Sequence, residues 1–225
     1  MKVIKKFGSD TESRALMEVF DRVLASTYYK WTLDSLEVYV SEYGRGDSWI
    51  EGNSGKIFFG REDQFVRSMD RKGMEAVVLC RLHSLIMKMQ GIDVRDARES
   101  YYSNDRGMFS ALLMAEEFAE NRRVAKQFPD RIFYKRFSEI SSASPSTTED
   151  FLRLGMCWLT FHGIDSWNAE YLEKTAMQKM PRDFDFSVFE TMKPTIPQGP
   201  LMGRDEILAI AGIMGKFISG AKPVQ

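Results

Sequence analysis

The chain has 225 residues, 44% of them hydrophobic and 28% charged, and its 16 Phe, 8 Tyr and 4 Trp exclude long disordered stretches. Its 31 basic and 32 acidic residues nearly cancel, so the sequence lacks the basic excess of a typical nucleic-acid-binding protein. No apolar run approaches the roughly 18 residues that a membrane-spanning helix needs, and residues 1–6 lack the apolar core of a signal peptide. We therefore expect a soluble, cytoplasmic protein that binds neither nucleic acid nor membrane.

The first predicted element is a helix near the N-terminus. Ser9 or Asp10 can cap it, and it runs to about Ser26. Its apolar residues fall at helical spacing on one face: Leu16, Val19, Phe20, Val23 and Leu24.

A small sheet follows this helix. Residues 36–40 alternate apolar and polar side chains, as a half-buried strand does, and 49–51 and 56–59 are two further short strands. A turn at 44–47 and a hairpin loop at 52–55 connect them. We predict an antiparallel sheet of about three strands.

The rest of the chain is predicted to be helical, with helices at about 62–71, 73–90, 105–127, 147–161, 166–179 and 203–219. The small, polar segment 141–148 is the best candidate for a domain boundary, and its end can cap the next helix. Prolines make 181–200 irregular. The fold class is α+β, with one domain at 1–143 and a helical C-terminal subdomain at 144–225 packed on it.

The densest group of basic residues lies between Arg122 and Arg136 and is interrupted by Asp130. We interpret it as a solvated helix face with an ordinary loop behind it.

Two cysteines, Cys80 and Cys157, each lie inside an apolar helical pattern. They lack CxxC spacing and any partner cluster, so neither a disulfide framework nor a zinc knuckle is indicated, and we expect no metal and no cofactor. Cys80 lies in mid-helix among apolar residues, where a thiol is packed and unreactive.

The predicted helix at 73–90 is apolar around much of its circumference and should be buried on more than one side. Cys80, Ser84 and Met87 share the face opposite its main apolar stripe, and His83 lies near them. A hydrogen-bonded histidine is the favoured interpretation of His83, in place of a metal ligand.

This order of helix, strands, buried helix and second helix resembles the zincin family, in particular its small gluzincin-like members. Cys80-Arg81-Leu82-His83-Ser84 then aligns with HExxH, in which two histidines bind zinc and the glutamate activates a water. Cys80 replaces the first histidine, Arg81 the general base and Ser84 the second histidine. The resemblance therefore implies a metallopeptidase-like fold that has lost its zinc site.

The resemblance also implies a carboxylate ligand on a following helix, and 115–122 matches that element. Glu116 and Glu120 share a face with apolar residues there, and Glu117 lies beside them. Carboxylates on an apolar face need partners, for which Arg81, Arg122 and Arg123 are the candidates. We define the remnant cleft as Cys80, Arg81, His83, Ser84, Met87, Glu116, Glu117 and Glu120.

Three functions remain open at this stage. The first is a non-catalytic, metallopeptidase-like protein that binds a peptide or protein partner in the remnant cleft, which Cys80, Ser84 and Met87 would then plug. The second is a hydrolase of another class that uses the carboxylates of Glu116, Glu117 and Glu120, which would then converge on solvent. The third is a structural subunit that forms a homodimer through the apolar helix at 203–219.

Overall fold

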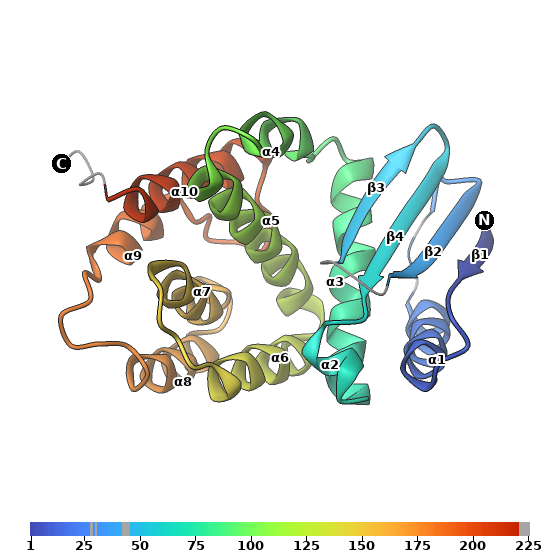
Figure 1. Cartoon of the computed structure of the whole chain (residues 1–225), viewed down its shortest axis with the longest axis horizontal. Coiled ribbons are helices and arrows are strands. Elements are labelled where there is room, and N and C mark those ends of the chain that lie inside the picture. The colour runs from blue at the N-terminus through green and yellow to red at the C-terminus, as the bar shows by residue number, and fades with distance from the viewer. Residues whose placement is uncertain (28, 30, 42–45, 221–225) are drawn as a thin grey trace. The chain divides into compact units, whose positions relative to one another are not determined.

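The computed structural model describes residues 1–27, 29, 31–41 and 46–220. They form two compact units, which divide between Gly91 and Ile92 (Figure 1). The class is α+β, as predicted, because a small sheet lies in the first unit and the remaining elements are helices. Part of the turn predicted at 44–47, namely 44–45, lies outside the described residues.

The first unit contains β1 (Lys2–Lys6), α1 (Thr11–Ser26), β2 (Ser35–Ser41), β3 (Asp47–Glu51), β4 (Ser54–Gly60), α2 (Gln64–Arg67) and α3 (Arg71–Met89). The described strands form one four-stranded sheet in the order β1-β2-β4-β3. The prediction of an antiparallel sheet of three strands was wrong: β1 pairs with β2, and β2 with β4, in parallel, and only β3 and β4 are antiparallel. The crossover through α1 makes the first parallel pairing feasible.

Helices α1 and α3 cover one face of this sheet. The ring of Phe20 on α1 lies edge-on to Phe59 on β4, at 6.2 Å between centroids. Gly55, on the same face of β4, packs so closely on α3 that an added Cβ would lie 2.7 Å from a methyl group of Leu85. The other face of the sheet carries a stack of Tyr39, Phe58 and Trp49. Apolar burial against α1 and α3 therefore fixes which side of each strand faces the core.

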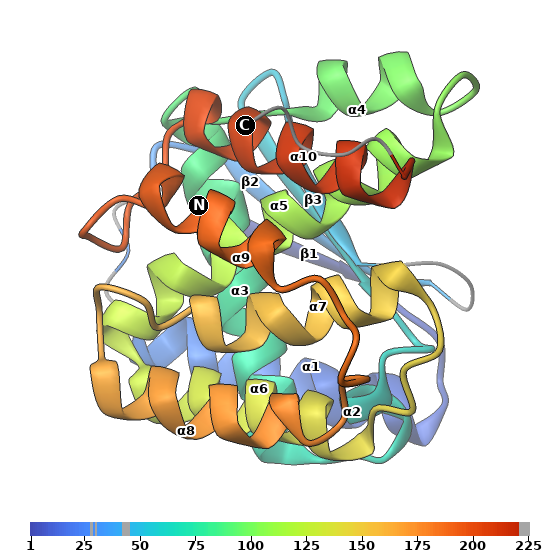
Figure 2. The same cartoon turned by 90° about the vertical axis from the view of Figure 1, so that its left-hand side faces the viewer.

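The second unit contains α4 (Arg95–Tyr101), α5 (Arg106–Gln127), α6 (Pro129–Ser142), α7 (Thr148–Leu159), α8 (Ser166–Met177), α9 (Ser187–Met192), a 3-10 turn (Lys193–Thr195) and α10 (Arg204–Ile218). Figure 2 shows α6, α7 and α8 side by side. Helices α4, α6 and α9 were not predicted. For α6 the missed signals are Pro129 in its first turn, Asp130 beside it, and buried Ile132, Arg136 and Ile140 at a spacing of four residues.

The segment at 141–148 connects α6 with α7 inside the second unit, so the compact units do not divide at the boundary expected at 143/144. Its predicted capping function is confirmed. The Thr147 side chain accepts a hydrogen bond from the backbone N–H of Asp150 at 3.2 Å, and the Asp150 carboxylate accepts one from the N–H of Thr147 at 3.0 Å.

Helix α10 packs along α5, and its small residues permit a close approach. An added Cβ at Gly215 would lie 2.7 Å from the sulfur of Met108 on α5. The buried residues of α10 are Ile207, Ile210, Ala211, Met214 and Gly215. The face that contains them is covered inside the second unit, while a homodimer through 203–219 stays a prediction. None of the helices in the described residues is long and apolar enough to cross a membrane.

The interpretation of the basic stretch between Arg122 and Arg136 as a solvated face was wrong, since Arg122, Lys135 and Arg136 are buried. Arg122 donates to the backbone oxygens of Leu159, Thr160 and His162 near the end of α7, and of Pro197 and Gly199 before α10. Its guanidinium also lies over the ring of Phe118. Burial lowers the pKa of Arg122 to about 10, so it remains charged at neutral pH.

Candidate functional site

The residues of the remnant cleft belong to both units. Cys80, Arg81, His83, Ser84 and Met87 lie on α3 in the first unit, and Glu116, Glu117 and Glu120 lie on α5 in the second.

On α3, two polar side chains in the segment aligned with HExxH, His83 and Ser84, are hydrogen-bonded inside the first unit. His83 is 1% exposed, and its Nε2 lies 2.7 Å from the hydroxyl of Tyr29, with the two rings edge-on. The hydroxyl of Ser48 on β3 donates to that of Ser84 at 2.8 Å, and Lys88 donates to the backbone oxygen of Ser48. The prediction of a hydrogen-bonded His83 is therefore confirmed.

Cys80, Ser84 and Met87 are each at most 4% exposed, and Arg81 is half-buried. Within the described residues, no group of three His, Cys, Asp or Glu side chains is placed to hold a metal ion. This face of α3 therefore offers packing and internal hydrogen bonds, with none of the convergent ligands that a zinc site needs.

On α5, Glu116 has a partner that the sequence did not suggest. Glu116 is buried and accepts a hydrogen bond from Nη1 of Arg98 on α4 at 3.0 Å. Arg122, one of the expected partners, instead binds the backbone oxygens described above. Glu120 is buried as well. The sequence analysis did not predict α4, so Arg98 was assigned to a loop. A residue in a loop is not expected to lie against a helix face, and Arg98 was therefore not considered as a partner of Glu116.

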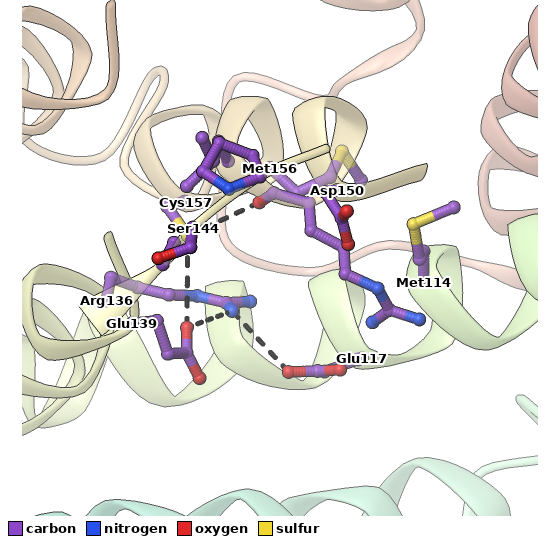
Figure 3. A pocket seen from close by; sticks show the side chains of 12 residues that line it. Met114, Glu117, Arg136, Glu139, Ser144, Asp150, Met156 and Cys157 are labelled. Carbon is purple, nitrogen blue, oxygen red and sulfur yellow. Dashed lines mark hydrogen bonds and ion pairs between the residues drawn. The ribbon is translucent and has the colours of Figure 1, made fainter. Parts of the chain in front are cut away.

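Glu117 belongs to a network of four charged side chains shared between α5 and α6. Its Oε1 lies 3.3 Å from Nζ of Lys135 and 3.5 Å from Nη1 of Arg136. Glu139 lies 2.7 Å from each of the same two cations, one at each oxygen. Figure 3 shows Arg136 lying between the two carboxylates. A nearly buried cation needs such partners, because an unpaired charge there would be costly.

The electrostatics of this network favour the charged forms of Glu139 and Arg136. Burial raises the pKa of Glu139, but the charges of Lys135 and Arg136 outweigh burial and hold it below its usual value. Burial likewise lowers the pKa of Arg136, yet Glu139 above all raises it past its usual range. The neighbouring thiol of Cys157 is buried, which raises its pKa to about 12.

Beside this network is a cavity of about 300 Å³ between α5, α6, α7 and the segment 143–145 (Figure 3). Its apolar walls are Met114, Leu154 and Met156, and its charged lining comprises Glu117, Arg136, Glu139, Asp150 and Arg153. Only Glu117 of the remnant cleft lines it. Arg136 also lines the cavity, and one signal in the sequence could have indicated its burial. This signal is the spacing of four residues between Ile132, Arg136 and Ile140 on α6.

Two groups that line the cavity are poorly suited to catalysis at neutral pH. Glu139 is a poor general base at neutral pH because its pKa is lowered, and Cys157 is a poor nucleophile because its thiolate is disfavoured. An apolar wall with a few charged groups at fixed positions is typical of small-ligand and peptide sites.

Comparisons of the chain with protein-family models, with curated proteins and with solved structures found no match.

Proposed function

We propose that this chain is a non-catalytic, metallopeptidase-like protein of the cytoplasm that binds a peptide or protein partner. The observation that carries the proposal is the set of side chains that α3 has in place of the zinc ligands and the general base. Where a zinc peptidase has its two histidines and its general base, this helix has Cys80, Ser84 and Arg81, and both Cys80 and Ser84 are buried. The hydrogen bonds Tyr29–His83 and Ser48–Ser84 occupy polar groups that a metal site would have to recruit.

The cavity beside Glu117 supports the binding half of the proposal. The cavity has a volume of about 300 Å³, and its walls combine apolar and charged groups. A partner peptide can bury an apolar side chain there without displacing the ion pairs of Glu117 and Glu139.

A hydrolase that uses Glu116, Glu117 and Glu120 has less support. Glu116 is paired with Arg98, and Glu117 with Lys135 and Arg136, so two of the three carboxylates are already bound to cations.

The loss of metal chemistry is tested by metal analysis. Protein purified without chelators or a histidine tag is measured by inductively coupled plasma mass spectrometry. We expect far less than one zinc or iron per chain. A stoichiometric metal would overturn the proposal.

The binding half is tested by selecting peptides from a random display library on the immobilised chain. Ser144→Trp places an indole at the exposed rim of the cavity and should abolish enrichment. Ser141→Trp adds the same side chain at an exposed position outside the cavity and should preserve it. Failure to enrich any peptide, or equal enrichment by the two variants, would contradict binding at this cavity.

A further inference from the structure

The charged residues that line the cavity differ in whether their charged groups already make hydrogen bonds or ion pairs within the protein. Glu117 and Glu139 are held by Lys135 and Arg136. Asp150 accepts hydrogen bonds from the backbone N–H groups of Ser146 and Thr147, both at 3.0 Å, at the start of α7.

Arg153 differs from these residues in the geometry of its interactions, because its charge acts on Asp150 only at a distance. It lies on α7, one turn after Asp150, and is exposed at the cavity. Within the part of the chain that the structure describes, its guanidinium makes no hydrogen bond and no ion pair, and its backbone oxygen accepts from the thiol of Cys157 at 3.3 Å. The backbone of Arg153 is thus anchored in the wall, while its charged end remains available.

We infer that the cavity binds the carboxylate of a ligand with an apolar body, with Arg153 binding the carboxylate and Met114, Leu154 and Met156 enclosing the apolar part. The inference rests on the proposed function, because it assigns a ligand chemistry to the same cavity. A guanidinium matches a carboxylate by two parallel N–H···O bonds, which gives geometric selectivity as well as attraction. Methionine side chains adapt to varied apolar shapes.

The charge balance around the cavity permits an anion. Glu117, Glu139 and Asp150 are offset by Lys135, Arg136 and Arg153, so the six groups sum to zero. The negative groups are tied to cations or to backbone N–H groups, whereas the guanidinium of Arg153 can turn toward a ligand. Arg153 attracts Asp150 through its charge without an ion pair or a hydrogen bond to it, so an incoming carboxylate gains a cation whose N–H donors are not engaged. An incoming ammonium would have to compete with Lys135 and Arg136 for Glu117 and Glu139.

The test uses N-acetyl-leucine as the probe and the neutral N-acetyl-leucine amide as its matched control. Binding to the full chain is followed by NMR of ¹³C-labelled methionine methyl groups, with Met114 and Met156 assigned by Met→Leu substitution. We expect saturable shifts at these two methyl groups, with the acid binding at least about tenfold more tightly than the amide.

The variant Arg153→Gln removes the charge at an exposed position and should weaken binding of the acid by about tenfold, while leaving the amide unaffected. Arg182→Gln removes an exposed arginine outside the cavity and should change neither. Equal affinity for acid and amide, an unchanged affinity in Arg153→Gln, or no saturable shift at Met114 and Met156 would each overturn the inference.

A third probe, an N-acetylated tripeptide ending in leucine, separates two sources of the carboxylate. Binding about tenfold tighter than that of N-acetyl-leucine would identify a peptide C-terminus, and equal binding a small free acid; both outcomes support recognition of a carboxylate. If the display selection succeeds while acid and amide bind equally, the proposed function stands and the carboxylate inference fails.

Discussion

Nη2 of Arg122 on α5 donates a hydrogen bond to the backbone oxygen of Gly199 at 2.7 Å, across 77 residues of chain. Nη1 of the same guanidinium donates a hydrogen bond at 2.7 Å to the backbone oxygen of His162, just beyond the C-terminal end of α7. One buried cation thus joins the central helix of the second unit to the end of α7 and to the segment that precedes α10. Carbonyl groups at a helix end are good partners for a cation because they have no donor within the helix.

Replacing Arg122 with Met retains most of the apolar stem but removes every donor. We expect the free energy of unfolding to fall by about 3 kcal/mol, because several inward-facing carbonyl groups lose their partners. Chemical denaturation followed by circular dichroism measures this change. Arg182→Met, at an exposed position, is the matched control and should be nearly silent. A silent Arg122→Met would show that water replaces the guanidinium at no cost.

Glu139→Gln should destabilise the second unit at pH 7 by about 3 kcal/mol, because it removes the charged carboxylate that lies 2.7 Å from both Lys135 and Arg136. The folded-state pKa of Glu139 lies below its ordinary value of 4.5. Its carboxylate therefore stabilises the fold above that pH, and the contribution is lost as the pH falls through the folded-state pKa.

Denaturation curves of wild type and Glu139→Gln between pH 7 and pH 3 should accordingly converge at the acid end. Glu170→Gln removes an exposed carboxylate that is paired with Lys174 and should leave the curves unchanged. A difference between wild type and Glu139→Gln that stays constant down to pH 3 would refute the linkage.

Gly155→Ala should destabilise the second unit, although alanine favours helices. An added Cβ at this position of α7 would lie 2.0 Å from the ring of Phe189 on α9, so the ring must move, at a net cost of about 2 kcal/mol. Gly212→Ala on α10 is the contrasting case: its Cβ meets nothing within 4 Å, and a gain of about 0.5–1 kcal/mol from helix propensity is expected. Thermal denaturation of the two variants should move in opposite directions. If both substitutions stabilised the protein, the ring of Phe189 would be able to move without a cost in free energy.

The thiol of Cys157 should resist alkylation in the folded chain. Its pKa of about 12 leaves roughly one thiol in ten thousand ionised at pH 8, and only the thiolate reacts. In a Cys80→Ser background, labelling with iodoacetamide followed by mass spectrometry should be at least about a hundredfold slower in buffer than in denaturing urea. Rapid labelling of the folded protein would place Cys157 at the surface.

Several features followed from the sequence because they are local. Asp10 caps α1 by accepting from the N–H of Ser13 at 2.8 Å, and a short carboxylate before an apolar repeat is sufficient to specify that geometry. The burial of Cys80 followed from the apolar residues around α3, which indicated a helix buried on more than one side. The inward position of Glu116 followed from its spacing along α5.

The sequence analysis was wrong about the burial of residues whose partners are distant along the chain. Arg136 was assigned to a solvated surface because charge alone, without a helix at 129–142, gives no reason for burial. Once α6 packs against α5 and α7, Glu117 and Glu139 offset the cost of removing this guanidinium from water.

By itself, then, the sequence determined the α+β class, the N-caps of α1 and α7 and the burial of α3, since each depends on periodicity or on contacts within a few residues. The tertiary structure alone decided the parallel pairing of β2 with β4, the ion pairs of Glu116 and Glu117, and the cavity at which Arg153 is available. These depend on which surfaces meet after the chain has folded back on itself. Pairing and burial energies between segments far apart in sequence leave no periodic signal in either segment.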